Sequence, residues 1–121
     1  MTIAHAQEPV KINSINFDNS DSIIFLGVSA GSDAEELKIT KKTLTDPDRI
    51  YFDIENAVIT FPSGIYEFKN SRLKQVRTAQ NSISPDIVRI VITSADGYDA
   101  SSEINVLQIK NNIIIKLGSE Q

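Results

Sequence analysis

Apolar and polar residues alternate along most of this chain in short runs, and turn-forming residues separate the runs. The clearest run is Arg49–Glu55, in which Ile50, Phe52 and Ile54 face one way and the residues between them face the other. Pro47 fixes its own φ and lacks a backbone donor, so a tight turn precedes the run. Asn56 is disfavoured in strands and ends it. The pattern predicts a turn that leads into a β-strand with one buried face.

The same alternation predicts strands in the rest of the chain. In Val10–Phe17 the apolar positions change parity, so we expect a bulge near Asn13-Ser14 that returns both pairs to the core. Leu73–Gln80 is expected to be a strand although Leu73 and Val76 differ in parity, and Lys110-Asn111-Asn112 is expected to form a hairpin turn. Other inner faces are expected at Ile24, Leu26 and Val28; Leu37, Ile39 and Thr43; Val88, Ile90 and Ile92; and Ile113, Ile115 and Leu117. Since no stretch has a sustained helical period, we predict an all-β fold.

The sequence also aligns with itself. A shift of 64 positions places Ile12 on Val76 and Leu26 on Ile90, and a shift of 63 places Ile50 on Ile113. Any two strands align by their period alone, but here three strands match in register, with matching turns between them. The repeat predicts a β-sandwich of two roughly four-stranded sheets related by a pseudo-twofold axis. Which strand belongs to which sheet does not follow from the sequence.

Length and charge limit the alternatives. The 121 residues suffice for one domain, which we expect at 10–118, between a start at 1–9 and a tail at 119–121. A net charge of −4 argues against nucleic acid as a partner, because phosphate binding needs a basic surface. No apolar run approaches the roughly 20 residues of a membrane-spanning helix, so we expect no membrane span. The absence of cysteine excludes a disulfide framework.

The first residues suggest export. Ala4-His5-Ala6 has the small-x-small pattern that precedes signal-peptidase cleavage, which would make Gln7 the mature end. We interpret 1–9 as the remnant of a leader; the alternative is an ordinary disordered terminus.

Catalysis is not expected. The single histidine, His5, lies in the expected leader remnant, and there is no cysteine to join it in a metal site. Nucleophile-elbow, phosphate-loop and dinucleotide glycine motifs are absent. Asp53 and Glu55 point the same way along one strand, which is typical of a solvated face and not of a glycosidase pair. We therefore expect no enzyme activity and no cofactor or metal.

Three strands carry a family resemblance. Leu44, the Asp46-Pro47 turn, Arg49 at the start of a strand and Asp53 near its end resemble the signature of the AMIN domain. Leu73–Gln80 resembles the strand of that family with an arginine near a glutamine, and Arg89 resembles the arginine of the strand that follows. The resemblance extends from about Val10 to Leu117. It implies a non-catalytic targeting module of cell-wall amidases and secretins that binds peptidoglycan or envelope partners.

Candidate contact residues follow from the expected exposed faces. Lys69, Arg72, Lys74 and Arg77 form a basic strip that is suited to the carboxylates of wall peptides. Lysines also protect edge strands from aggregation, and we favour this role for Lys69 and Lys74. Tyr51, Tyr66 and Tyr98 have ring faces that stack on sugars, although tyrosine is common on strands for its β propensity alone. For Arg49 and Asp53 we expect a structural network around the turn.

The leading hypothesis is therefore an exported, periplasmic envelope module that binds peptidoglycan and localises an attached amidase or secretin domain. Two alternatives remain. One is a docking domain that binds other envelope proteins, and the other is a carbohydrate-binding sandwich for a glycan unrelated to the wall.

Overall fold

The computed structural model describes residues 8–18, 23–29, 33–45, 48–68, 72–97 and 104–117. In these ranges the chain forms strands joined by turns, with one short 3-10 turn, η1 (Ala34–Glu36). The strands are β1 (Val10–Asp18), β2 (Ile23–Val28), β3 (Ile39–Leu44), β4 (Arg49–Glu55), β5 (Ala57–Ile59), β6 (Gly64–Glu67), β7 (Leu73–Ser82), β8 (Ile87–Ser94), β9 (Ile104–Ile109) and β10 (Asn112–Leu117). The predicted all-β fold is confirmed.

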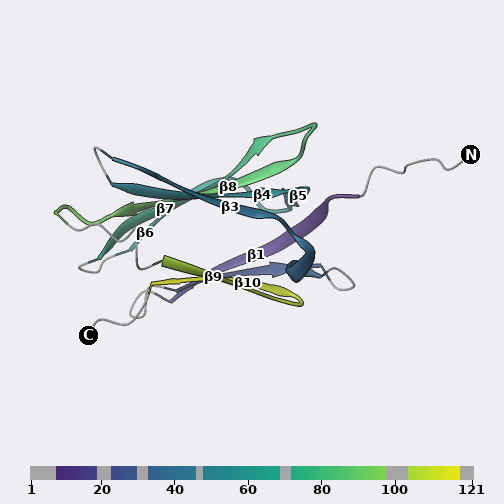
Figure 1. The fold of residues 1–121 in the computed structure, drawn as a ribbon, viewed down its shortest axis with the longest axis horizontal. Helices are drawn as coiled ribbons and strands as arrows, with labels where there is room; N and C mark the ends of the chain where they lie inside the picture. Colours follow the sequence, from purple (N-terminus) through teal and green to yellow (C-terminus); the bar gives the residue numbers. More distant parts are fainter. Residues whose placement is uncertain are drawn as a thin grey trace, which may run out of the picture.

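Two sheets pack face to face and appear as two layers in Figure 1. Sheet A has the strand order β5-β1-β2-β10-β9, and sheet B has the order β3-β4-β8-β7-β6. The predicted β-sandwich is therefore correct. Each sheet has five strands where about four were expected, because the short segments β5 and β6 each add an edge strand.

The core lies between the sheets and includes most of the inward residues that the alternation predicted, together with Ala34, Ala57, Phe68 and Ile104. In β4, Ile50, Phe52 and Ile54 are fully buried. The other predicted inner positions are buried as well, apart from Ile39, which is half-buried, and Thr43, which is exposed: Ile24, Leu26, Val28, Leu37, Val88, Ile90, Ile92, Ile113, Ile115 and Leu117. Burial of these aliphatic side chains is the main favourable contribution to folding.

The internal repeat exchanges the two sheets. The first four repeat strands, β1 to β4, correspond to β7 to β10, so the order β1-β2-β10-β9 in sheet A becomes β7-β8-β4-β3 in sheet B. The pairing follows the shift of 64 positions: Ile12 lies opposite Val28, and Val76 lies opposite Ile92. The predicted pseudo-twofold relation thus interchanges the layers.

One detail of the predicted alignment is wrong. Leu26 lies opposite Ile113, whereas its repeat counterpart Ile90 lies opposite Phe52. Ile113 therefore corresponds to Phe52 and not to Ile50, a displacement of two residues. Because side chains alternate with a period of two, such a displacement keeps every apolar residue on the inner face, and the apolar pattern does not detect it.

Two bulges explain the changes in parity. The β1–β2 register shifts between Ile12 and Ser14, as predicted, so that Ile15 and Phe17 also pack against the core. The β7–β8 register shifts between Leu73 and Gln75, which lets both Leu73 and Val76 be buried. An extra residue in one strand turns the following side chains to the other face.

Strand β6 was not predicted, and neither were two shorter elements, β5 and η1. Strand β4 ends at Asn56, which has a φ of 55°, and the chain then forms β5, parallel to β1. The single turn η1 begins after Asp33, whose Oδ1 accepts a hydrogen bond from the Glu35 backbone N at 2.9 Å. Both elements are three residues long, too short to show a period.

Several predictions lie outside the described residues: the cleavage pattern at Ala4–Gln7, Asp46 and Pro47 of the turn, Lys69, Tyr98 and the tail at 119–121. Within the described ranges, no helix has the length and hydrophobicity needed to cross a membrane.

Candidate functional site

The outward side chains of sheet B, which we call the B face, bring together residues from all three motif strands. In one row across the strands, Tyr51 lies opposite Val91, Val91 opposite Arg77, and Arg77 opposite Ile65. In the adjacent row, Asp53 lies opposite Arg89 and Arg89 opposite Ala79. Side chains at such positions on one face of a sheet are direct neighbours.

Asp53 and Arg89 form an ion pair with two hydrogen bonds at the centre of the B face. Arg89 Nε donates to Asp53 Oδ1 at 2.7 Å, and Arg89 Nη2 donates to Asp53 Oδ2 at 2.9 Å. The hydrogen bond to Asp53 raises the pKa of Arg89 above its ordinary value, against the opposing effect of partial burial. The Asp53 carboxylate therefore balances the positive charge of Arg89, and the two hydrogen bonds fix the plane of the guanidinium.

Tyr51 is part of the same cluster. The Cζ atom of Arg89 lies 4.4 Å from the centroid of the Tyr51 ring, within the range of a cation–π interaction. Arg89 thus covers one face of the ring, so a sugar has no access to Tyr51 from that side. Asp53, Arg89 and Tyr51 thus form one cluster on the B face.

Beside this cluster is an open hollow with a volume of about 330 Å³. Its lining residues are Arg77, Ala79, Gln80, Asn81, Arg89 and Val91. Ala79 has a short side chain between longer neighbours, which leaves space above β7. No ion pair joins the exposed Arg77 to any carboxylate in the described part of the chain. The hollow thus has a free guanidinium on one side and the Asn81 amide and a neutralised arginine on the others.

The other predicted contact residues do not line this hollow. Arg72 is half-buried at the beginning of β7, where its carbonyl accepts from the Ala95 backbone N at 2.9 Å, and its contacts include further interactions. Lys74 is exposed, with its Nζ 3.8 Å from Asp96 Oδ1. Among the described residues of the predicted basic strip, Arg77 lines the hollow, and Arg72 and Lys74 do not.

A comparison with family models decides the classification. The model described as the AMIN domain matches residues 30–117, about three quarters of the chain. The chain belongs to the AMIN domain family. This family consists of non-catalytic targeting domains associated with peptidoglycan in envelope proteins. The match begins after β2 and includes β3 to β10, so it covers every residue of the B face. No curated protein and no solved structure matches the chain.

The remaining AMIN signature residues lie around the start of β4. Arg49 is half-buried and lies opposite Leu44 on β3 and Thr93 on β8. Leu44 itself is exposed. Arg49 does not pair with Asp53, whose partner is Arg89 from the third AMIN motif strand.

Gln80 is a structural residue whose role the sequence analysis did not predict. Its Oε1 accepts from the Ile59 backbone N at 3.0 Å, and its Nε2 donates to the carbonyls of Ala57, Ser82 and Ile87 at 3.0, 3.1 and 3.2 Å. One side chain therefore joins β5 of sheet A to β7 and β8 of sheet B. The signal was its place in the AMIN strand that carries an arginine near a glutamine.

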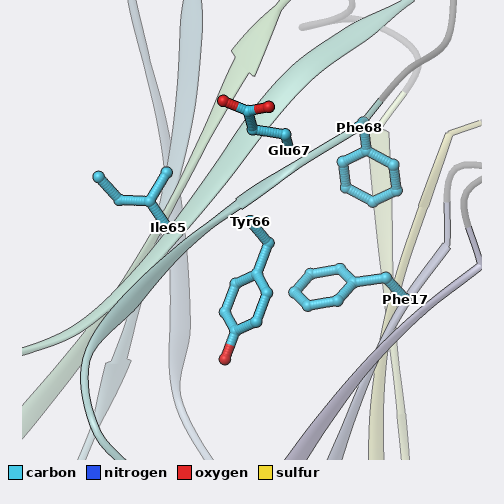
Figure 2. A pocket seen from close by; sticks show the side chains of 5 residues that line it. All are labelled: Phe17, Ile65, Tyr66, Glu67 and Phe68. Atoms are coloured by element: carbon cyan, nitrogen blue, oxygen red, sulfur yellow. The ribbon is translucent and has the colours of Figure 1, made fainter.

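A second hollow lies at the edge strand β6 and is lined by Phe17, Ile65, Tyr66, Glu67 and Phe68. Figure 2 shows the rings of Phe17, Tyr66 and Phe68 turned toward one another, with the Glu67 carboxylate pointing away. The ring centroid of Phe17 lies 4.4 Å from that of Tyr66 and 5.5 Å from that of Phe68. The hollow has a volume of about 310 Å³. The Phe17 ring packs against the rings of Tyr66 and Phe68. Tyr66, a predicted stacking residue, therefore belongs to an aromatic cluster that joins β1 to β6.

Proposed function

We propose that this AMIN domain is an exported, periplasmic module that binds peptidoglycan through the B face and holds an attached amidase or secretin domain at the wall. The residues that make contact are Arg77 and Asn81 of the adjacent hollow, with Asp53, Arg89 and Tyr51 as their rigid support. The module itself performs no chemistry on the wall.

The observation that carries this proposal is the contrast between two arginines. Arg89 is neutralised by Asp53, whereas Arg77 lies exposed beside an open hollow and has no described carboxylate partner. Arginine binds carboxylates through two parallel hydrogen bonds, and the peptide stems of the wall carry carboxylates. A free guanidinium next to the Asn81 amide is therefore suited to a stem-peptide carboxylate.

The test is co-sedimentation with purified sacculi at low and high salt. Arg77→Gln should reduce the bound fraction and make the remaining binding less dependent on salt, since exposed charge contacts are screened by salt. Lys116→Gln, on the outer face of sheet A, removes the same charge elsewhere and should leave binding unchanged. Sacculi whose carboxyl groups have been amidated should bind the unsubstituted domain as weakly as untreated sacculi bind the Arg77 variant.

Two results would contradict the proposal in different ways. If the unsubstituted domain stays in the supernatant at both salt concentrations, it does not bind the wall. If it sediments but Arg77→Gln and amidation have no effect, it binds the wall through another surface.

A further inference from the structure

Strand β9 is an edge of sheet A that carries no charge, proline or bulge to prevent another strand from pairing with it. Its six residues, Ile104–Ile109, are apolar or amide residues, and its register with β10 is regular. The other described edges are protected. Strands β5 and β6 have only three and four residues, β1 contains a bulge, and β3 carries Lys41 and Lys42. Strand β9 is therefore the edge best suited to the addition of a strand.

Every second residue of β9 directs its backbone N–H and C=O away from β10. The turn between the two strands has two residues, so Ile109 and Asn112, which flank it, form a hydrogen-bonded pair, and such pairs alternate along the ladder. Leu107 and Asn105 therefore bond to β10 as well. The backbone groups of the residues between them point to the free side of the strand: Ile104, Val106 and Gln108.

The rest of the domain satisfies this free side only in part. Lys41 of β3 donates from Nζ to the Ile104 carbonyl at 3.1 Å, in agreement with the outward direction of that carbonyl. In the described part of the chain, no other group bonds to the outward N–H and C=O of Val106 and Gln108. The turn η1 contacts β9 through the side chain of Gln108. The four remaining backbone groups have the direction and spacing that an extended chain matches.

An open hollow with a volume of about 260 Å³ lies on the same side, between β9 and β3. Its lining residues are Ile39, Lys41, Phe52, Ile104, Asn105, Val106 and Gln108. Lys41 Nζ and Gln108 Nε2 already donate to backbone carbonyls, whereas Ile39 and Val106 pack against the core and remain half-buried. A residue paired with Val106 in an antiparallel strand has its side chain on the same face as Val106. An aliphatic side chain at that position enters the hollow and buries Ile39 and Val106 further.

We infer that the free edge of β9 adds an extended, antiparallel segment of a partner protein, with aliphatic side chains at the alternate positions that face the hollow. The segment bonds to the backbone of Val106 and Gln108 and covers the side chains of Ile39 and Val106. A second copy of β9 is disfavoured, because β3 lies beside β9 and the lysine-bearing β3 edges of the two copies would come together. Wall binding is assigned above to the other sheet, so the two proposals can fail separately.

The test compares two short peptides that alternate valine and serine and differ only in which backbone nitrogens are methylated. Methylation of the serines leaves free the backbone edge that belongs to the valines, and methylation of the valines blocks that edge. Each peptide is titrated into the isotopically labelled full chain, and amide chemical shifts are followed by NMR. The serine-methylated peptide should shift the amides of Val106 and Gln108 and slow their exchange with solvent. The valine-methylated peptide should bind about tenfold more weakly.

Two variants separate the backbone of Val106 from its side chain. Val106→Pro removes the outward N–H and no hydrogen bond of the β9–β10 ladder, so it should abolish binding of the serine-methylated peptide. Val106→Ala keeps the N–H and should weaken that binding only several-fold. Thermal unfolding verifies that each variant is folded. The comparison of the two peptides needs no variant, so it decides the inference even if Val106→Pro does not fold.

Three results would overturn the inference. Equal affinities of the two peptides, or no binding of either at about 1 mM, would exclude pairing with the β9 edge. Chemical-shift changes confined to residues outside β9 and β3 would place the site elsewhere. Dimerisation in sedimentation equilibrium that Val106→Pro abolishes would identify a second copy as the occupant of the edge.

Discussion

Asp53 and Arg89 come from different motif strands of the AMIN domain and are joined across β4 and β8 by hydrogen bonds of 2.7 and 2.9 Å. Their side chains are 19% and 34% exposed, so water screens the interaction only in part. The pair links the two central strands of sheet B and holds the Arg89 guanidinium against Tyr51. Two motif residues that are 36 positions apart thus form one structural unit.

We therefore expect Asp53 and Arg89 to be energetically coupled. In a double-mutant cycle with Asp53→Asn and Arg89→Gln, followed by urea unfolding, the coupling free energy should be about 1–2 kcal/mol. The control is the Lys38–Glu55 pair, whose atoms are 3.5 Å apart and whose side chains are 76% and 45% exposed. That cycle should give a coupling of about 0.5 kcal/mol or less. Equal coupling in both cycles would mean that the geometry of the central pair has no energetic consequence.

The same pair leads to an expectation for pH. The pKa of Arg89 is raised in the folded state, chiefly by its hydrogen bond to Asp53. A group with a raised pKa contributes stability below its unfolded pKa and loses it as the pH rises through the folded pKa. For arginine both values lie far into the alkaline range. The free-energy cost of Arg89→Gln should therefore be the same at about pH 7 and about pH 9.

Phe52 is the largest fully buried side chain of the core. Phe52→Ala should lower the free energy of unfolding by about 3–5 kcal/mol, because the cavity between the sheets is not refilled. Chemical denaturation measures this change directly. As a control, Ile83→Ala in the turn before β8 removes a side chain that is 76% exposed and should change the stability by about 0.5 kcal/mol or less. A small effect at Phe52 would contradict the assignment of the inner face of β4.

Gln80 offers a test of how β5 is held. Gln80→Ala should lower the free energy of unfolding by about 1–3 kcal/mol, because four backbone groups lose their partner. Amide hydrogen exchange should accelerate at Ile59, whose backbone N donates to Gln80. Gln108→Ala is the matched control: Gln108 Nε2 donates to the carbonyls of Ala34 and Leu37, so this variant should loosen η1 and leave Ile59 protected. Unchanged exchange at Ile59 in Gln80→Ala would show that the β1–β5 ladder is sufficient.

The period of the sequence determined which side chains are buried, and this explains what was predictable. Ile50, Phe52 and Ile54 had to share a face, and the parity change in β1 required a bulge. The pairing of Arg89 with Asp53 was not predictable, because it depends on which strands are neighbours and on their register. The hollow beside Arg77 depends on Ala79 and on the spatial order of β7 and β8. Local patterns do not contain this information.

The last prediction separates binding from stability among the signature and strip arginines. Arg77 is exposed, so Arg77→Gln should change the melting temperature little while it reduces binding to sacculi. The double variant Arg72→Gln/Arg77→Gln should bind no more weakly than Arg77→Gln, because Arg72 does not line the hollow. Arg49 is half-buried at the start of β4, opposite the buried Thr93, so Arg49→Gln should lower the melting temperature before it affects binding. If Arg49→Gln keeps its stability and loses the wall while Arg77→Gln unfolds, the roles are reversed, and the binding surface lies around the start of β4.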